Sequence, residues 1–167
     1  MSGALIVTAG LRAADFARFD QLRRTHFPVD RNQLPAHLTL FHALPPSAKV
    51  ELAALLKQLA VGPPPAAVTD GLLNMGQGVA IRIRSDELSN LHEQIADHFH
   101  GSLTSQDAAG WRPHITIQNK VEPNHAKALF DQLSVGWTDT RVHITALELH
   151  RYLGGPWAAV GRYPFRG

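Results

Sequence analysis

The sequence predicts an α+β fold of two lobes around a central groove, with the helices on the outside. Two observations lead to this fold. The order strand, helix, H-x-T strand, helix occurs twice along the chain, which indicates a duplicated structure. Each half also contains two alternating apolar segments that enclose a glycine-containing turn, the pattern of a β-hairpin. Hairpins mixed with helices favour mainly antiparallel strands, and we expect two such sheets related by a pseudo-twofold axis.

The first half of the chain is predicted to contain two strands and two helices. These are a strand over residues 5–8, a helix over 15–25, a strand over 36–41 and a helix that ends before Gly62. We expect Asp15 and Ser47 to cap the two helices, because such side chains accept hydrogen bonds from the first turn. In the second helix, the leucines at 52, 55, 56 and 59 have the spacing of one buried helical face. Gly62 and the prolines at 63–65 stop this helix.

The second half repeats the order of the first. Its expected elements are a strand over 79–83, a helix capped by Ser85, a strand over 114–117 and a helix that opens at Pro123. The helix after Ser85 carries Leu88, Leu91, Ile95 and Phe99 on one stripe. The two hairpins are expected over 66–83 and 142–163.

Length and composition fit one globular domain. The chain has 167 residues, of which 44% are hydrophobic and 18% are charged, so it is able to bury a core. The lobes, over 1–62 and 79–135, are short and no long linker separates them, so we expect a single compact domain over 1–167. No cysteine is present, which excludes disulfides, thiolate metal sites and cysteine nucleophiles.

Hydropathy and charge narrow the expected location and partners. No apolar run approaches the roughly 20 residues that a membrane-spanning helix needs. The apolar segment at the N-terminus has no basic residue before it, unlike a secretory signal peptide. We therefore expect a cytoplasmic monomer with no membrane partner. A formal net charge of +2 does not predict strong sequence-independent binding to nucleic acid, but it is compatible with a protein that grips one or two phosphates.

Two His-x-Thr pairs carry the chemical prediction. Residues i and i+2 of a strand point to the same face, so His37 projects with Thr39, and His114 projects with Thr116. A lone pair of this kind is usually packing, but these two lie at equivalent points of the repeat. A third pair begins at His143, has no counterpart in the other half, and is assigned to structure.

Paired imidazoles and hydroxyls fit the opening of a strained phosphodiester. One imidazole takes a proton from the attacking water, and the other protonates the departing ribose oxygen, since both titrate near neutral pH. The two threonine hydroxyls donate hydrogen bonds to the phosphate oxygens. This chemistry needs no metal and no cofactor, and we expect neither. His98 and His100 show no metal-binding spacing on a matching element.

The segments Pro35-Ala-His37-Leu-Thr39-Leu and Arg112-Pro-His114-Ile-Thr116-Ile resemble the twin signatures of the 2H phosphoesterase superfamily. Within that superfamily, the chain is similar along essentially its whole length to the 2′-5′ RNA ligase-like (LigT) group. The resemblance implies a bilobal α+β fold and metal-independent hydrolysis of 2′,3′-cyclic phosphates or related phosphodiesters. It also implies that His37 and His114 are the catalytic pair, with Thr39 and Thr116 as phosphate-binding hydroxyls. Which histidine is the acid stays open.

Three further residues are candidates for substrate binding. Many relatives carry an arginine after the second motif, whereas this chain has Gln118, Asn119 and Lys120. Lys120, if the strand continues, and Arg112 share the face of His114, so either side chain is placed to contact phosphate; the alternative for Lys120 is a solvated strand end. Phe41 shares the face of His37 and either stacks on a nucleobase or packs in the core.

The leading functional hypothesis is a metal-independent phosphoesterase that hydrolyses the 2′,3′-cyclic phosphate of an RNA end or a small nucleotide. Three alternatives remain open. One is reversible 2′-5′ RNA ligation, which is related chemistry. Another is an RNA- or nucleotide-binding module without catalysis. The last is a metal hydrolase with histidine ligands.

Overall fold

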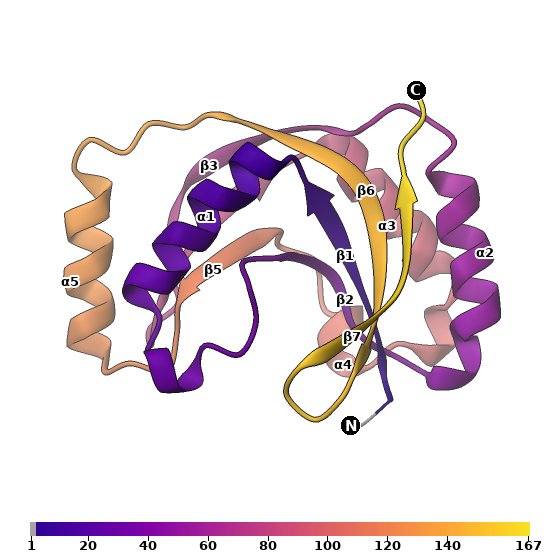
Figure 1. The fold of residues 1–167 in the computed structure, drawn as a ribbon, viewed down its shortest axis with the longest axis horizontal. Coiled ribbons are helices and arrows are strands. Elements are labelled where there is room, and N and C mark those ends of the chain that lie inside the picture. The colour runs from indigo at the N-terminus through magenta and orange to yellow at the C-terminus, as the bar shows by residue number, and fades with distance from the viewer. Residues whose placement is uncertain (1–2) are drawn as a thin grey trace.

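The computed structural model describes residues 3–167 as an α+β fold (Figure 1). Its strands are β1 (Leu5–Leu11), β2 (Leu38–Leu44), β3 (Ala66–Asn74), β4 (Val79–Arg84), β5 (His114–Gln118), β6 (Arg141–Tyr152) and β7 (Trp157–Pro164). Its helices are α1 (Ala13–His26), α2 (Lys49–Leu59), α3 (Asp86–His98), α4 (Ser105–Ala108) and α5 (Pro123–Ser134). The α+β class is confirmed, and only α4 falls in a segment where no helix is expected.

All strand pairings are antiparallel, as expected, and they join into one sheet of seven strands. The strands follow the order β2-β1-β6-β3-β4-β5, and β7 pairs with β6. The long strand β6 makes this continuity possible, because its first residues pair with β3 and the rest pair with β1 and β7. The two expected sheets are therefore halves of one sheet that share β6. The pseudo-twofold axis stays a prediction.

The two motif strands lie at opposite ends of this strand order. β2 is the first strand and β5 is the last, and no hydrogen-bonded ladder connects them. The sheet nevertheless bends so that β2 and β5 come into contact. Both expected hairpins form, with β3 paired to β4 and β6 paired to β7.

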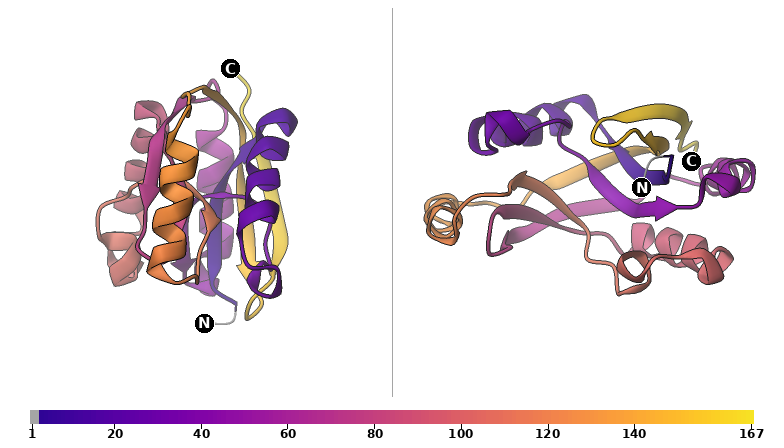
Figure 2. Two further views of the ribbon diagram at one scale, coloured as in Figure 1. Left: turned by 90° about the vertical axis from the view of Figure 1, so that its left-hand side faces the viewer. Right: turned by 90° about the horizontal axis from the view of Figure 1, so that it is seen from below.

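The longer helices lie at the periphery, with α1 and α5 at one end of the molecule and α2 and α3 at the other (Figure 2). The buried residues of α2 and α3 belong to the predicted stripes, with Leu52 and Leu56 in α2 and Leu88 and Ile95 in α3. In α1 the buried aromatic side chain is Phe19. Among the described residues, no helix is long and apolar enough to cross a membrane.

One of the three expected helix caps is confirmed. The side chain of Ser85 accepts a hydrogen bond from the Leu88 backbone N–H at 3.0 Å, which caps α3. Ser47 lies in a 3₁₀ turn before α2, and that helix has no side-chain cap. Asp15 lies inside the first turn of α1, since the helix already begins at Ala13.

The third His-x-Thr pair has the structural role assigned to it. The buried carboxylate of Asp15 accepts a hydrogen bond from the backbone N–H of His143 at 2.8 Å. The Nδ1 atom of the His143 ring lies 3.3 Å from the same carboxylate oxygen. These contacts attach α1 to β6, which explains why Asp15 is not used as a cap.

Candidate active site

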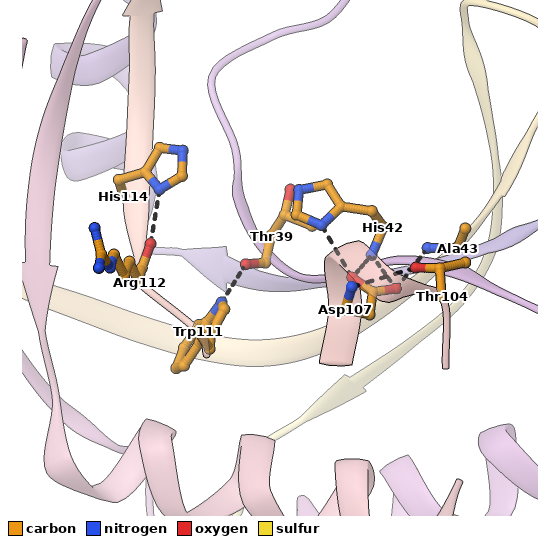
Figure 3. A network of polar contacts seen from close by, with 8 residues as sticks. All are labelled: Thr39, His42, Ala43, Thr104, Asp107, Trp111, Arg112 and His114. Atoms are coloured by element: carbon orange, nitrogen blue, oxygen red, sulfur yellow. Dashed lines mark hydrogen bonds and ion pairs between the residues drawn. The ribbon is translucent and has the colours of Figure 1, made fainter. Parts of the chain in front are cut away.

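The two motif histidines have the same local geometry although they come from opposite ends of the sheet. His37 lies just before β2, and its Nδ1 donates a hydrogen bond to the Pro35 carbonyl at 2.8 Å. His114 opens β5, and its Nδ1 donates to the Arg112 carbonyl at 2.7 Å (Figure 3). A carbonyl oxygen only accepts, so in the neutral ring the proton is on Nδ1 and Nε2 carries the lone pair. Both rings therefore offer Nε2 for proton transfer.

Both motifs line one pocket of about 270 Å³, which we call the H-x-T pocket. His37, Thr39, His114 and Thr116 all border it, as does Arg112. Its other lining residues are Leu40, His42, His92, Gln106, Asp107, Gly110, Trp111 and Trp157. Five of the seven residues singled out in the sequence are thus brought together in one place, and two are not.

Phe41 is one of the two that the structure places elsewhere. In the β1–β2 pairing, Val7 lies opposite Phe41 while Thr8 lies opposite Thr39, so β2 has one extra residue between them. Such a β-bulge reverses the alternation of side chains beyond it. Phe41 therefore points into the core, where it is 0% exposed and stacks on His92 at 4.4 Å. The expectation that Phe41 stacks on a nucleobase is wrong.

The same bulge brings His42 to the H-x-T pocket, a residue that the sequence pattern missed. Its Nδ1 lies 3.1 Å from Oδ1 of Asp107 on α4 (Figure 3). That carboxylate also accepts from the backbone N–H groups of His42 and Ala43 at 2.9 and 3.0 Å. Burial alone raises the pKa of Asp107, but these hydrogen bonds hold the pKa below its usual value. The helix-start pattern Thr104-x-x-Asp107 is the sequence signal that points to α4, with Thr104 as its cap.

Three stacked aromatic rings lie next to the first motif, and one of them is hydrogen-bonded to the backbone of Thr39. His92 lies between Phe41 and Trp111, at 4.4 and 4.5 Å between ring centroids and within 4° of parallel to each. The indole Nε1 of Trp111 donates to the Thr39 backbone carbonyl at 2.9 Å. Trp111 thereby joins the first motif to the segment just before the second motif. Sequence reasoning missed both His92 and Trp111, because only the tertiary packing brings them together.

The surroundings of His37 favour its neutral form. The Trp157 ring lies 4.7 Å from the His37 ring at an angle of 60°. Burial, with a smaller contribution from the nearby Arg23 charge, lowers the pKa of His37 to about 4 despite the opposing hydrogen bond to Pro35. His37 is therefore neutral at neutral pH and able to accept a proton.

Lys120 is the second residue that does not lie where the strand pattern places it. β5 ends at Gln118, and Lys120 has a left-handed backbone with φ of 62°, so the strand does not continue to it. Lys120 instead lines a second cavity, of about 450 Å³, together with His37 and Thr116. The two cavities are neighbours, since His37, Thr116 and Trp157 border both.

Among residues 3–167, no group of three or more His, Cys, Asp or Glu side chains is arranged to hold a metal ion. His98 pairs with Glu51 at 2.7 Å, and His100 bonds to the Asp97 carbonyl at 3.1 Å.

The α+β fold with a His-x-Thr pair at each end of its sheet, both facing one pocket, defines a 2H-type phosphoesterase architecture. The family model of the 2′-5′ RNA ligase superfamily matches residues 11–156, and the chain belongs to this superfamily. No curated protein matches the sequence.

Solved structures with the same fold have low sequence identity to this chain. TT0787 of Thermus thermophilus superposes with a TM-score of 0.71 and 16% identity, over 98% of each chain. LigT of E. coli in complex with 3′-AMP has a TM-score of 0.64 and 16% identity, over 100% of each chain. A structure described as a phosphoesterase has a TM-score of 0.62 and 18% identity, also over 100% of both chains. These likenesses show the fold.

Proposed function

We propose that this protein is a metal-independent phosphoesterase that hydrolyses the 2′,3′-cyclic phosphate of an RNA end or a small nucleotide. The observation that carries the proposal is the matched pair of histidines. Each ring is fixed through Nδ1 by a carbonyl two residues earlier, and both line the pocket that the two threonines border. The complex of E. coli LigT with 3′-AMP supports a small nucleotide as ligand, because 3′-AMP is a ribonucleoside monophosphate.

In the proposed reaction, His37 is the general base and His114 is the general acid. The neutral His37 removes a proton from water through Nε2 while the water oxygen forms a bond to phosphorus. The bond from phosphorus to one ribose oxygen breaks, and His114, which enters this step with a proton on both ring nitrogens, gives that oxygen its Nε2 proton. The product is a phosphomonoester beside a free hydroxyl. Thr39 and Thr116 donate to the non-bridging oxygens as charge grows there, and Arg112 is placed to bind the same phosphate.

A second candidate function is 2′-5′ RNA ligation, which the description of the matched family model favours. It uses the same acid and base. The 5′-hydroxyl of a second RNA replaces water as the nucleophile, and the product is a 2′-5′ phosphodiester instead of a phosphomonoester.

Trp157 offers a test of the role assigned to His37. We expect kcat/KM to fall as the pH drops through about 4, because protonated His37 cannot accept a proton. Replacing Trp157 by alanine exposes His37 to water and raises its pKa toward the ordinary 6.5, so this acid limb moves to higher pH. Profiles of kcat/KM against pH for wild type and Trp157→Ala measure the shift.

Trp137→Ala is the control, because the Trp137 indole donates to Asp139 and this residue lines neither cavity. An acid limb that stays in place in Trp157→Ala would contradict the assignment.

Turnover with a chelator present tests the proposed function directly. The substrates are a nucleoside 2′,3′-cyclic phosphate and an RNA oligomer with the same end group. We expect the wild-type protein to open both substrates at the same rate with and without chelator. Activity that disappears with chelator and returns with a divalent ion would indicate a metal hydrolase. Tight nucleotide binding without turnover would indicate a binding module.

A further inference from the structure

The cavity next to the H-x-T pocket is cationic. Arg23, Arg31 and Lys120 line it, and no aspartate or glutamate does. We call it the cationic cavity. His37 and Thr116 also line it. A volume of about 450 Å³ is sufficient for a phosphate group with part of a nucleotide.

Arg23 is a buried cation without a carboxylate partner. Its side chain comes from α1, and the residue is 5% exposed. Nε donates to the side-chain oxygen of Asn32 at 2.9 Å, and Nη1 donates to the Thr116 carbonyl at 2.9 Å. Within residues 3–167, no carboxylate oxygen lies within 4 Å of its guanidinium.

Burial without a counter-ion is costly for a guanidinium. Burial accordingly lowers the pKa of Arg23, and only the more distant Asp20 opposes this shift. Of the five N–H donors of a guanidinium, the described residues accept from two. An anion in the cavity would supply both the missing charge and the missing acceptors.

Arg31 and Lys120 hold the remaining charge at the mouth of the cavity. Nη1 of Arg31 donates to the Lys120 carbonyl at 3.3 Å, so the two loops that carry these residues are joined. Both residues are exposed. Together with Arg23, they place one cation inside the cavity and two at its rim.

We propose that the cationic cavity binds a second phosphate group of the substrate, the one on the 5′ side of the nucleotide whose cyclic phosphate reacts. This inference rests on the proposed function. His37 and Thr116 border both cavities, so a group bound to Arg23 is next to the reacting phosphate. A guanidinium binds phosphate through parallel hydrogen bonds, which suits Arg23 and Arg31. The preferred substrate is therefore an RNA end, or a nucleotide with a 5′-phosphate, over a nucleoside cyclic phosphate alone.

Equilibrium binding of three stable probes tests the subsite without catalysis. Adenosine 3′-monophosphate occupies the H-x-T pocket alone, and adenosine 3′,5′-bisphosphate adds a 5′-phosphate. A diadenosine dinucleotide with a 3′-phosphate adds a phosphodiester in the same position.

Isothermal titration is expected to give a bisphosphate dissociation constant at least about tenfold lower than that of the monophosphate. We expect the gain to shrink as salt is raised, because the rim cations are exposed. A gain for the bisphosphate alone identifies a terminal 5′-phosphate as the ligand, and a gain for both identifies RNA.

Variants connect this gain to the cavity. The quantity compared is the dissociation constant of the monophosphate divided by that of the bisphosphate. Arg31→Gln and Lys120→Gln should each reduce this ratio several-fold, and Arg23→Gln should bring it near one. Arg23→Lys keeps the positive charge but loses the planar guanidinium. We therefore expect its ratio to lie between those of Arg23→Gln and the wild-type protein. Lys57→Gln on α2 is the matched control and should leave the ratio unchanged. If Arg23→Gln fails to fold, the binding ratios of Arg31→Gln and Lys120→Gln alone test whether the cationic cavity binds the second phosphate.

The outcomes separate this inference from the proposed function. A wild-type ratio near one overturns the second subsite, even if cyclic phosphates are hydrolysed. A ratio that the rim variants leave unchanged overturns it as well. A high ratio that these variants abolish supports the subsite even if no substrate is turned over, and in that case it is the hydrolase function that fails.

Discussion

Replacing either His37 or His114 by alanine is expected to lower kcat for 2′,3′-cyclic phosphate hydrolysis by about 10²–10⁴-fold. Each substitution removes one of the two proton transfers in the proposed reaction. The double variant should lose much less than the product of the two single losses, because the two residues act in the same step. Initial rates at saturating substrate, measured beside the thermal unfolding midpoint, separate lost chemistry from lost structure.

His143 is the matched control for this experiment. It stands in the same H-x-T pattern, but its contacts are with Asp15 and it lines neither cavity. We expect His143→Ala to keep most of the wild-type kcat at a temperature where it stays folded. Losses in the His37 and His114 variants no larger than that of His143→Ala would reject the two-histidine reaction.

Asp107→Ala is expected to lower the free energy of unfolding by about 2–4 kcal/mol at neutral pH. The carboxylate is buried and accepts hydrogen bonds from two backbone N–H groups and from the His42 ring. Its removal leaves those N–H groups without acceptors and loosens α4 from β2. Urea unfolding at pH 7 measures the loss, and kcat/KM reports whether the His42 side of the pocket is disturbed.

The pH dependence of this loss has a defined sign. The pKa of Asp107 is lower in the folded protein than in the unfolded chain, so its ionised form stabilises the fold above the unfolded value of 3.8. That contribution disappears as the pH falls through the folded pKa, and the gap between wild type and variant should narrow there. Asp131→Ala is the control, because its ion pair with Lys127 is exposed. A gap at pH 7 no larger than that of Asp131→Ala would contradict the role of Asp107.

The repeated order of elements and both motifs could be predicted from the sequence, because each depends on local periodicity. Spacing of apolar residues places the helices, and the strand period of two places His114 beside Thr116 in the pocket. The same period of two gives the wrong face for Phe41. One additional residue in β2 turns the side chains beyond it to the opposite face of the sheet. No local pattern signals that residue, because the bulge is defined only by the pairing of β2 with β1.

The remaining site residues depend on contacts between distant segments. Asp107 lies 65 positions from His42, and Arg23 lies 93 positions from Thr116. Hydrophobic patterns carry no information on such polar pairs, because the two members of each pair belong to segments far apart in the sequence. The cap expected at Asp15 failed for the same reason, because the distant His143 provides a buried partner for that carboxylate.

The continuity of the sheet through β6 has a consequence for the order in which the fold is completed during synthesis. Both motifs leave the ribosome before β6, since β6 begins at Arg141 and the second motif ends near Thr116. β6 is the strand that pairs with both β1 and β3, and so connects the half with His37 to the half with His114. Its pairing with β1 closes loops of about 140 residues, a slow event compared with local helix formation. A nascent chain therefore carries both motifs before β6 is made, and the two halves of the sheet are joined only after that strand has been synthesised.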